Sequence, residues 1–206
     1  MSAERHFYEP KAGHGLAHDP FNSIVAPRPI GWISTHNGEG GRNLAPYSFF
    51  NALNYRPPMI GFASIGWKDT VRNIEKSREF VWNLATKALA EGMNVSSTTT
   101  GPEVDEFDLA GVEAAPSKLI TAPRVAAAPV NFECRLADII QLKTASGDTV
   151  DTWFVTGEVV GVHIDGQYLK DGVYQTAAPH PILRAGGLGG YAEITPASMF
   201  ELMRPG

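Results

Sequence analysis

The sequence predicts a mainly β fold, an antiparallel β-barrel with short helical insertions. Three observations lead to this prediction. Short apolar segments alternate with turn-forming residues, which indicates strands joined by hairpins. The 206 residues include 21 Gly and 15 Pro, which interrupt the chain too often for long helical bundles or coiled coils. The chain also lacks the succession of strand, glycine-rich turn and helix that dinucleotide-binding and P-loop proteins need.

The first part of the chain is expected to form an N-terminal extension and three strands. Residues 1–26 look irregular, and Pro27 and Pro29 then force extended backbone, because each proline fixes its own φ and restricts the preceding residue. The glycines within residues 37–41 allow a hairpin turn. A proline pair at residues 57–58 ends the second strand, which is expected to be bent. The three strands are residues 30–35, 43–51 and 59–65.

A short helix is expected after the third strand. Asp69 or Thr70 caps it, and it runs to about Ser77. Val71 and Ile74 lie three residues apart and therefore face inward together.

The next region returns to a strand and then leaves the sheet. Residues 80–84 have strand composition. Residues 86–128 form a long, loop-rich excursion. Its helical content is expected at residues 86–95 and 103–109.

Strict alternation predicts a half-buried strand at residues 130–136. It places Phe132, Cys134 and Leu136 on a buried face. The opposite, polar face comprises Asn131, Glu133 and Arg135.

The partner of this strand is expected at residues 152–164, after a turn at residues 146–148. β-Branched and aromatic residues dominate the partner. Its glycines, Gly157 and Gly161, allow bulges or corners in a closed sheet. With no internal repeat in the sequence, residues 1–206 are expected to form one domain.

Composition excludes several classes of partner. There are 17 Lys and Arg against 22 Asp and Glu, a net charge of −5, so no broad basic surface favours nucleic acid or an anionic membrane. Charged residues make up 19%, below the ~25% of typical soluble chains, so apolar surface hidden in a homodimer is expected. No secretory signal or membrane-spanning run is present, and a cytoplasmic protein is expected. The single cysteine, Cys134, excludes an intramolecular disulfide.

Several known motifs are incomplete in this chain. The glycines at residues 38–40 and 187–189 lack the third glycine of the fingerprint G-x-G-x-x-G, and no Walker sequence is present. Residues 61–66 contain one residue too many for the nucleophile elbow G-x-S-x-G. His14 and His18 have the spacing of a metal-binding helix, but a glycine and a proline flank them, so a solvated loop and no metal site are expected.

Residues 64–74 indicate a site for a phosphate monoester. A strand ends at Ser64, and the next helix begins with a hydroxyl residue beside Lys68. Free backbone N–H groups, the positive end of the helix dipole, a hydroxyl and an ammonium group therefore meet at one point. This segment alone agrees equally well with an ordinary capped helix.

The preceding strand favours the phosphate interpretation. Residues 45–51 offer backbone amides, a hydroxyl and aromatic walls close in sequence to the proposed phosphate site. These groups suit a planar heteroaromatic ligand, and flavin mononucleotide (FMN) joins such a ring to a phosphate. The alternative is an aromatic core strand, to which Phe49 or Phe50 would belong.

Five motifs occur in an order that resembles a known family. They are Arg28-Pro29-Ile30-Gly31-Trp32-Ile33-Ser34-Thr35, Asn43-Leu44-Ala45-Pro46-Tyr47-Ser48-Phe49-Phe50-Asn51, Ser64-Ile65-Gly66, Lys68-Asp69-Thr70 and Phe80-Val81-Trp82-Asn83-Leu84. The series resembles the flavin reductase-like family, flavoproteins with an FMN-binding split β-barrel that are related to NAD(P)H:flavin reductases and flavoredoxin. The resemblance covers residues 21–85. Beyond residue 101 it is limited to the strand layout and to residues 180–184.

The resemblance implies a set of residues that bind FMN. One group follows the flavin ring and ribityl chain, a second ends the next strand, and a third holds the phosphate; Arg28 is a further phosphate or ribityl ligand unless it is a surface arginine. These residues are Arg28, Pro46, Tyr47, Ser48, Phe49, Ala63, Ser64, Ile65, Lys68, Asp69 and Thr70. His180 lies where some reductases place a histidine near the nicotinamide, or is a structural loop residue. No other catalytic side chain is implied.

The implied activity is that of an NAD(P)H:flavin oxidoreductase. Hydride would pass from NADH or NADPH to FMN, and electrons onward to free flavin, oxygen, an oxygenase or an electron-transfer protein. FMN is expected between the subunits of a homodimer. Two alternatives stay open: a flavoredoxin-like electron carrier that binds FMN without an NAD(P)H site, and a haem or pyridoxamine-phosphate protein on a related barrel. The resemblance leaves the roles of residues 86–128 and 186–190 open.

Overall fold

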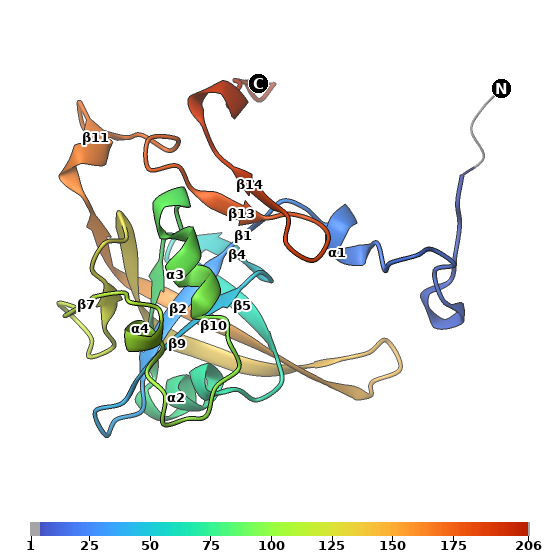
Figure 1. Cartoon of the computed structure of the whole chain (residues 1–206), viewed down its shortest axis with the longest axis horizontal. Helices are drawn as coiled ribbons and strands as arrows, with labels where there is room; N and C mark the ends of the chain where they lie inside the picture. Colours follow the sequence, from blue (N-terminus) through green and yellow to red (C-terminus); the bar gives the residue numbers. More distant parts are fainter. Residues whose placement is uncertain (1–4, 206) are drawn as a thin grey trace.

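Seven antiparallel strands form the main sheet of the protein. The computed structural model describes residues 5–205, and its strands lie in the order β3-β2-β6-β9-β10-β5-β4 (Figure 1). Every strand expected for this sheet is present, and the bent one is divided into β3 and β4. The bounds are β2 Gly31–His36, β3 Arg42–Tyr47, β4 Phe50–Tyr55, β5 Pro58–Ile65, β6 Glu79–Asn83, β9 Val130–Lys143 and β10 Thr149–Ile164.

The two edge strands of this sheet, β3 and β4, are consecutive in the chain. Only residues 48–49 separate them, and the amide of Ala63 in β5 donates to the carbonyl of Phe49 at 2.8 Å. A sheet whose two edges are joined by so short a segment curls until the edges come together. The predicted antiparallel split barrel is therefore confirmed.

Strand β2 separates two hydrophobic cores. Ile33 packs inside the barrel with Phe62 and Phe80, whereas its neighbour Trp32 packs with Met93 on the outer face. All five side chains are buried. Because successive side chains of a strand point to opposite faces, a strand that is buried on both faces needs a covering layer outside the barrel.

Residues 86–128 provide this covering layer (Figure 1). The predicted helical content is confirmed, with η2 Lys87–Leu89, α3 Ala90–Val95 and α4 Glu106–Leu109. Helices α3 and α4 contact β3, and the short pair β7 Ala114–Ala115 and β8 Arg124–Val125 lies over β6. The excursion thus closes the second core.

The prediction of a half-buried β9 is wrong at two of its three polar positions. Cys134 and Leu136 are buried and Arg135 is exposed as predicted, but Asn131 and Glu133 are buried as well. The carboxylate of Glu133 accepts hydrogen bonds from the amides of residues 118 and 119, both at 2.7 Å. The excursion covers this face, so the polar residues that the alternation assigned to solvent have become its anchors.

Helix α2 Asp69–Ser77 follows the predicted bounds, and its inward residues Val71 and Ile74 are fully buried. The predicted cap is wrong. The N-cap is Lys68, with no side-chain hydrogen bond to the first turn. The Asp69 carboxylate instead pairs with Arg72, and the Thr70 hydroxyl accepts from an asparagine of β3. The first turn therefore keeps its N–H groups uncapped.

The long hairpin β9–β10 carries the bulges that the sequence predicts. The register shifts between Thr156 and Gly157 and again between Val159 and Gly161. A methyl group on Gly157 would lie 2.5 Å from the ring of Phe80, so this position also needs glycine for close packing.

A smaller sheet consists of β1 Arg28–Pro29, β13 Ile182–Arg184 and β14 Tyr191–Glu193. Residues 186–190 connect β13 to β14. The guanidinium of Arg184 donates to the carbonyls of Gly187, Leu188 and Gly190. The glycine-rich segment is therefore a braced hairpin loop.

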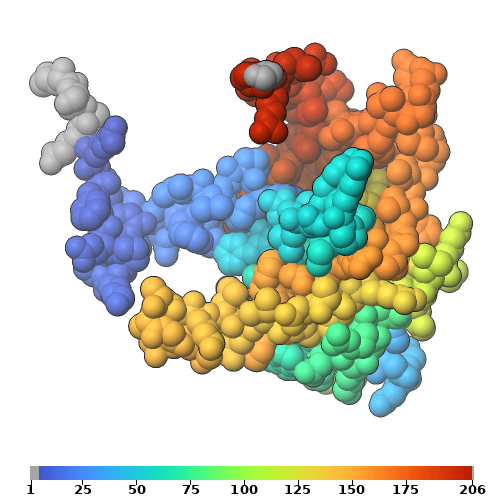
Figure 2. Space-filling view, turned by 180° about the vertical axis from the view of Figure 1, so that it is seen from behind, coloured from blue at the N-terminus to red at the C-terminus, as the bar shows by residue number. Residues whose placement is uncertain are grey.

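The remaining elements lie at the periphery. The N-terminal segment contains η1 Pro10–Ala12 and α1 Phe21–Ile24 and projects from the barrel, as does the tip of the β9–β10 hairpin (Figures 1 and 2). The strands β11 Leu169–Lys170 and β12 Val173–Tyr174 and the turns η3 Gly166–Tyr168 and η4 Pro196–Ser198 complete the chain. Within residues 5–205, no helix has the length and apolar character needed to cross a membrane.

Candidate functional site

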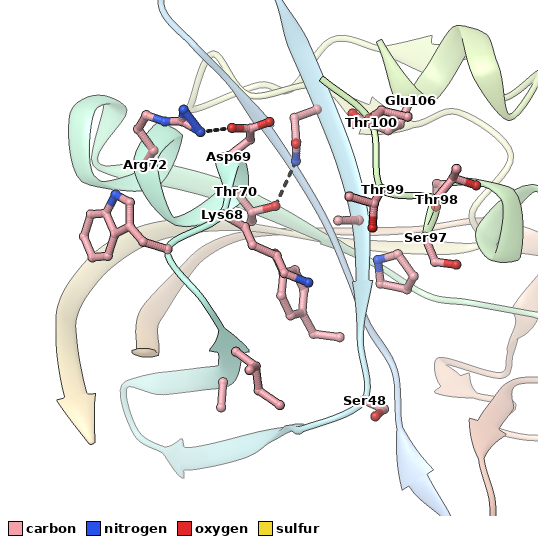
Figure 3. A pocket seen from close by; sticks show the side chains of 18 of the residues that line it. Ser48, Lys68, Asp69, Thr70, Arg72, Ser97, Thr98, Thr99, Thr100 and Glu106 are labelled. Carbon is pink, nitrogen blue, oxygen red and sulfur yellow. Dashed lines mark hydrogen bonds and ion pairs between the residues drawn. The ribbon is translucent and has the colours of Figure 1, made fainter. Parts of the chain in front are cut away.

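A cavity of about 500 Å³ lies between the barrel and the excursion, beside the first turn of α2 (Figure 3). One side is formed by the end of β3, by residues 48–49, by the end of β5 and by the start of α2. The other side is formed by residues 96–100 and Glu106. Figure 3 shows these two walls facing each other, with Lys68 and Thr70 on one and Ser97 to Thr100 on the other.

Most of the predicted site residues line this cavity. Nine of the eleven residues assigned to FMN do so: Pro46, Tyr47, Ser48, Phe49, Ala63, Ile65, Lys68, Asp69 and Thr70. The structure thus brings three separate sequence segments together in one place. Their contact with FMN stays a prediction.

Arg28 does not line the cavity, and its expected role as a phosphate or ribityl ligand has no support in the structure. Its guanidinium donates to the carbonyls of Ser48 at 3.2 Å, Asn22 at 2.6 Å and Val25. It also lies over the ring of Phe49, 5.7 Å from the centroid. Arg28 is buried and therefore braces the loop between β3 and β4 from behind.

Ser64 and His180 also lie outside the cavity lining. The Ser64 hydroxyl is fully buried and donates to the carbonyl of Gly66 at 2.9 Å, which supports the turn before α2. His180 has a positive φ of 54°, and its Nδ1 lies 2.6 Å from Oε1 of Glu193. The structural interpretation of His180 is therefore better supported than a role near the nicotinamide.

The start of α2 is suited to an anion. The backbone N–H groups of residues 69–71 make no hydrogen bond inside residues 5–205, and Lys68 is exposed at the cavity. Gly66, with φ of 86°, turns the chain so that this end of the helix meets the end of β5. The Thr70 hydroxyl accepts from Nδ2 of Asn43 at 2.9 Å and keeps its proton for another acceptor. Several donors therefore converge at the positive end of the helix dipole.

Tyr47 places a buried phenol in the barrel wall of the cavity. Its hydroxyl is closed to solvent and lies near the hydroxyls of Thr70 and Ser64, while its ring packs 4.6 Å from that of Phe62. Burial raises the pKa of the phenol, and the hydroxyls of Thr70 and Ser64 offset part of that rise. The phenol is thus protonated at neutral pH.

Sequence reasoning missed the second wall of the cavity. Residues 96–100, Ser-Ser-Thr-Thr-Thr, line it together with Glu106, and so do Asn43, Trp67 and Arg72 on the first wall. Five consecutive hydroxyl residues were the available signal. Trp67, which the resemblance did not account for, packs edge-on against Trp153 with centroids 4.5 Å apart.

The donors and apolar surfaces together fit a flat heteroaromatic ligand that carries a phosphate. Phe49, Ile65 and Trp67 offer apolar contact, and the start of α2 offers the anion site. Residues 5–205 contain no group of three or more His, Cys, Asp or Glu side chains that could hold a metal ion.

Comparison with known proteins agrees with this geometry. The sequence model of a family described as "Flavin reductase like domain" matches residues 24–182. A protein of Halalkalibacterium halodurans is 34% identical over 189 residues, which cover 88% of this chain and 87% of that protein.

Solved structures extend the comparison. Nitrilotriacetate monooxygenase component B from Bacillus cereus is 27% identical, with a TM-score of 0.82 and 98% of each chain covered. The 2-nitrobenzoate 2-nitroreductase of Pseudomonas fluorescens is 29% identical, with a TM-score of 0.79, 90% of this chain and 88% of that chain covered. Flavoredoxin of Desulfovibrio vulgaris, at 20% identity, a TM-score of 0.73 and coverage of 88% of this chain and 91% of its own, shares the fold.

Proposed function

The chain belongs to the flavin reductase-like family, and from this membership we propose that it is an FMN-binding oxidoreductase that takes electrons from NADH or NADPH. The electrons pass onward to free flavin, oxygen or a protein partner. One observation carries the proposal: the uncapped first turn of α2 and the ammonium of Lys68 lie at the same cavity as the aromatic side chains of Phe49 and Trp67.

The residues of the cavity bind and orient the cofactor. The N–H groups of residues 69–71 and the ammonium of Lys68 hold the phosphate, because both donate to an anion at a helix N-terminus. Phe49 and Trp67 would offer apolar contact to the ring. FMN itself supplies the redox chemistry when bound. No side-chain acid or base is required.

A second copy of the chain is proposed to complete the site. Ile65, which lines the cavity, is 62% exposed, and Ile24 of α1 is 70% exposed. Helix α1, which carries Ile24, is tied by Arg28 to the carbonyl of Ser48 at the cavity. A partner subunit that covers this apolar surface would also narrow access to the cavity. Light scattering of the purified protein would measure its mass in solution and so test for a dimer.

One series of spectra tests the proposed activity. The visible absorption of the purified chain is recorded first, then after addition of FMN, and then in stopped-flow mixing with NADH and with NADPH. We expect flavin bands that bleach with at least one donor. A Soret band, or a chain that does not take up FMN, would overturn the FMN proposal.

The same experiment separates the reductase from an electron carrier. If FMN stays oxidised with both nucleotides but is reduced by a reduced electron-transfer protein, the carrier is the correct function. An oxygenase is the class of partner proposed as acceptor, since one relative by structure is a monooxygenase component.

A further inference from the structure

The excursion contributes a second set of donors to the cavity, opposite α2. The hydroxyls of Ser97 and Thr98 donate back to the carbonyls of Asn94 and Val95 at 2.6 and 2.8 Å, so their protons are used. Thr99 differs. Its hydroxyl and its N–H group make no hydrogen bond within residues 5–205, and the N–H group of Thr100 makes none either. Three donors of this segment therefore have no protein partner within these residues, and both threonines line the cavity.

A single carboxylate ties this segment to the barrel. Glu106 is 6% exposed although it lines a polar cavity. Its Oε1 accepts from the Thr100 hydroxyl at 3.0 Å, and its Oε2 accepts from the amide of Leu44 in β3 at 3.2 Å. Leu44 lies between Asn43 and Ala45, which both line the opposite wall. Glu106 therefore sets the distance between the two walls.

The helix that carries Glu106 is itself held against β3. The Asp105 side chain caps α4 by accepting from the amide of Phe107 at 2.9 Å. Arg42, the first residue of β3, donates to Asp105 at 2.5 Å and to Asp108 at 2.9 Å, and its guanidinium lies over the Phe107 ring. A carboxylate on so firmly anchored a helix acts as a fixed strut.

We propose that Glu106 is a positioning residue that holds Thr99 and Thr100 as the second half of the phosphate site. The inference rests on the proposed FMN site and deepens it, because it assigns the choice of phosphorylated over unphosphorylated flavin to the excursion as well as to α2. Glu106 acts through its two hydrogen bonds and makes no contact with the ligand.

The test compares the affinities of FMN and riboflavin in three variants. Glu106→Ala removes both hydrogen bonds, and Thr100→Val removes only the bond to the segment. Both are expected to weaken FMN binding by about fivefold or more while riboflavin binding changes less than about twofold. Glu106→Gln can still accept from Leu44 and can donate to Thr100, so its FMN affinity is expected within about threefold of the wild-type value.

The control is an exposed carboxylate farther along the excursion. Glu113→Ala removes a side chain outside the cavity lining, and both affinities are expected to stay unchanged. Retained riboflavin binding shows that a variant is folded. If Glu106→Ala does not fold, Thr100→Val decides the question.

Three results would overturn the inference. They are equal losses for FMN and riboflavin, unchanged FMN affinity in both Glu106→Ala and Thr100→Val, and failure of Glu106→Gln to restore binding. Failure of the proposed function looks different, because then the wild-type chain itself does not bind FMN.

Discussion

The two walls of the cavity are built by different physical means. The barrel wall is fixed by continuous ladders, such as the pairing of β5 with β10 over residues Met59 to Ile65. The excursion, residues 86–128, has only the short pair β7–β8 as a ladder and is held by three carboxylates, those of Glu79, Glu106 and Glu133, which form hydrogen bonds with backbone amides. Of these three, Glu106 lies in the cavity wall. Many weak, repeated bonds tolerate the loss of one, whereas a buried carboxylate that holds several donors does not.

The largest effect is expected at the most deeply buried carboxylate that holds the excursion on the barrel. Glu133 is fully buried and holds the amides of Lys118 and Leu119 together with Nε2 of His163 at 2.5 Å. Glu133→Ala should lower the free energy of unfolding by about 3 kcal/mol, because three donors lose their acceptor. Urea unfolding measures it. The exposed Glu158→Ala on β10 is the control, and an equal loss there would contradict the comparison.

The barrel should be destabilised by changes in side-chain packing. A methyl group at Gly157 would lie 2.5 Å from ring atoms of Phe80, which is itself fully buried. Gly157→Ala should therefore cost about 2 kcal/mol of unfolding free energy through overpacking. Gly166→Ala, where a methyl group meets no atom within 4 Å, is the control and should be nearly neutral. Equal stabilities of the two variants would refute the packing argument.

A smaller effect is expected on binding at the barrel wall. Lys68→Ala removes the ammonium group at the start of α2, and the FMN affinity should fall roughly tenfold with riboflavin affinity unchanged. Lys76→Ala, at the other end of the same helix, keeps the local dipole and the cavity intact. Fluorescence titration measures both ligands, and a similar loss in the two variants would exclude a specific phosphate contact.

The smallest effect expected is a pH dependence of the stability that Glu133 contributes. Burial would raise the pKa of Glu133, but its hydrogen bonds to His163 and to the amides of Lys118 and Leu119 outweigh burial and lower the pKa below the usual 4.5. The ionised Glu133 carboxylate therefore contributes its full stabilisation above pH 4.5. That contribution is lost as the pH falls through the lower pKa that Glu133 has in the folded state. The stability difference between wild type and Glu133→Gln should shrink below pH 4.5 and stay constant from there to neutral pH. A difference that grows on acidification would reverse the assigned sign.

The local sequence pattern predicted the elements whose structure depends on neighbouring residues. The helix with Val71 and Ile74 inward, the turn before Arg42 and the bulge at Gly157 all follow from short-range periodicity and glycine placement. The barrel wall of the cavity could be predicted for the same reason. Its residues belong to consecutive strands and one helix that the chain order brings together.

Contacts between segments that are distant in the chain could not be predicted from the sequence. Alternation assigned Glu133 to solvent, because it cannot show that a loop from residues 118–122 will lie over β9. Glu106 and Thr99 were missed for the same reason, since they are 60 or so residues from the strand that they face. Arg28 was assigned to a ligand or to the surface, and the structure shows it buried, with its guanidinium donating to three carbonyls.

The sequence by itself determined the antiparallel barrel, the position of α2 and the segments of one cavity wall, because hydrophobic periodicity, proline and glycine act on the nearest residues. Only the tertiary structure decided that residues 86–128 cover the barrel, that buried carboxylates hold them there and that five hydroxyl residues complete the cavity. Such contacts depend on which surfaces remain to be covered once the barrel has closed, and no local pattern records that.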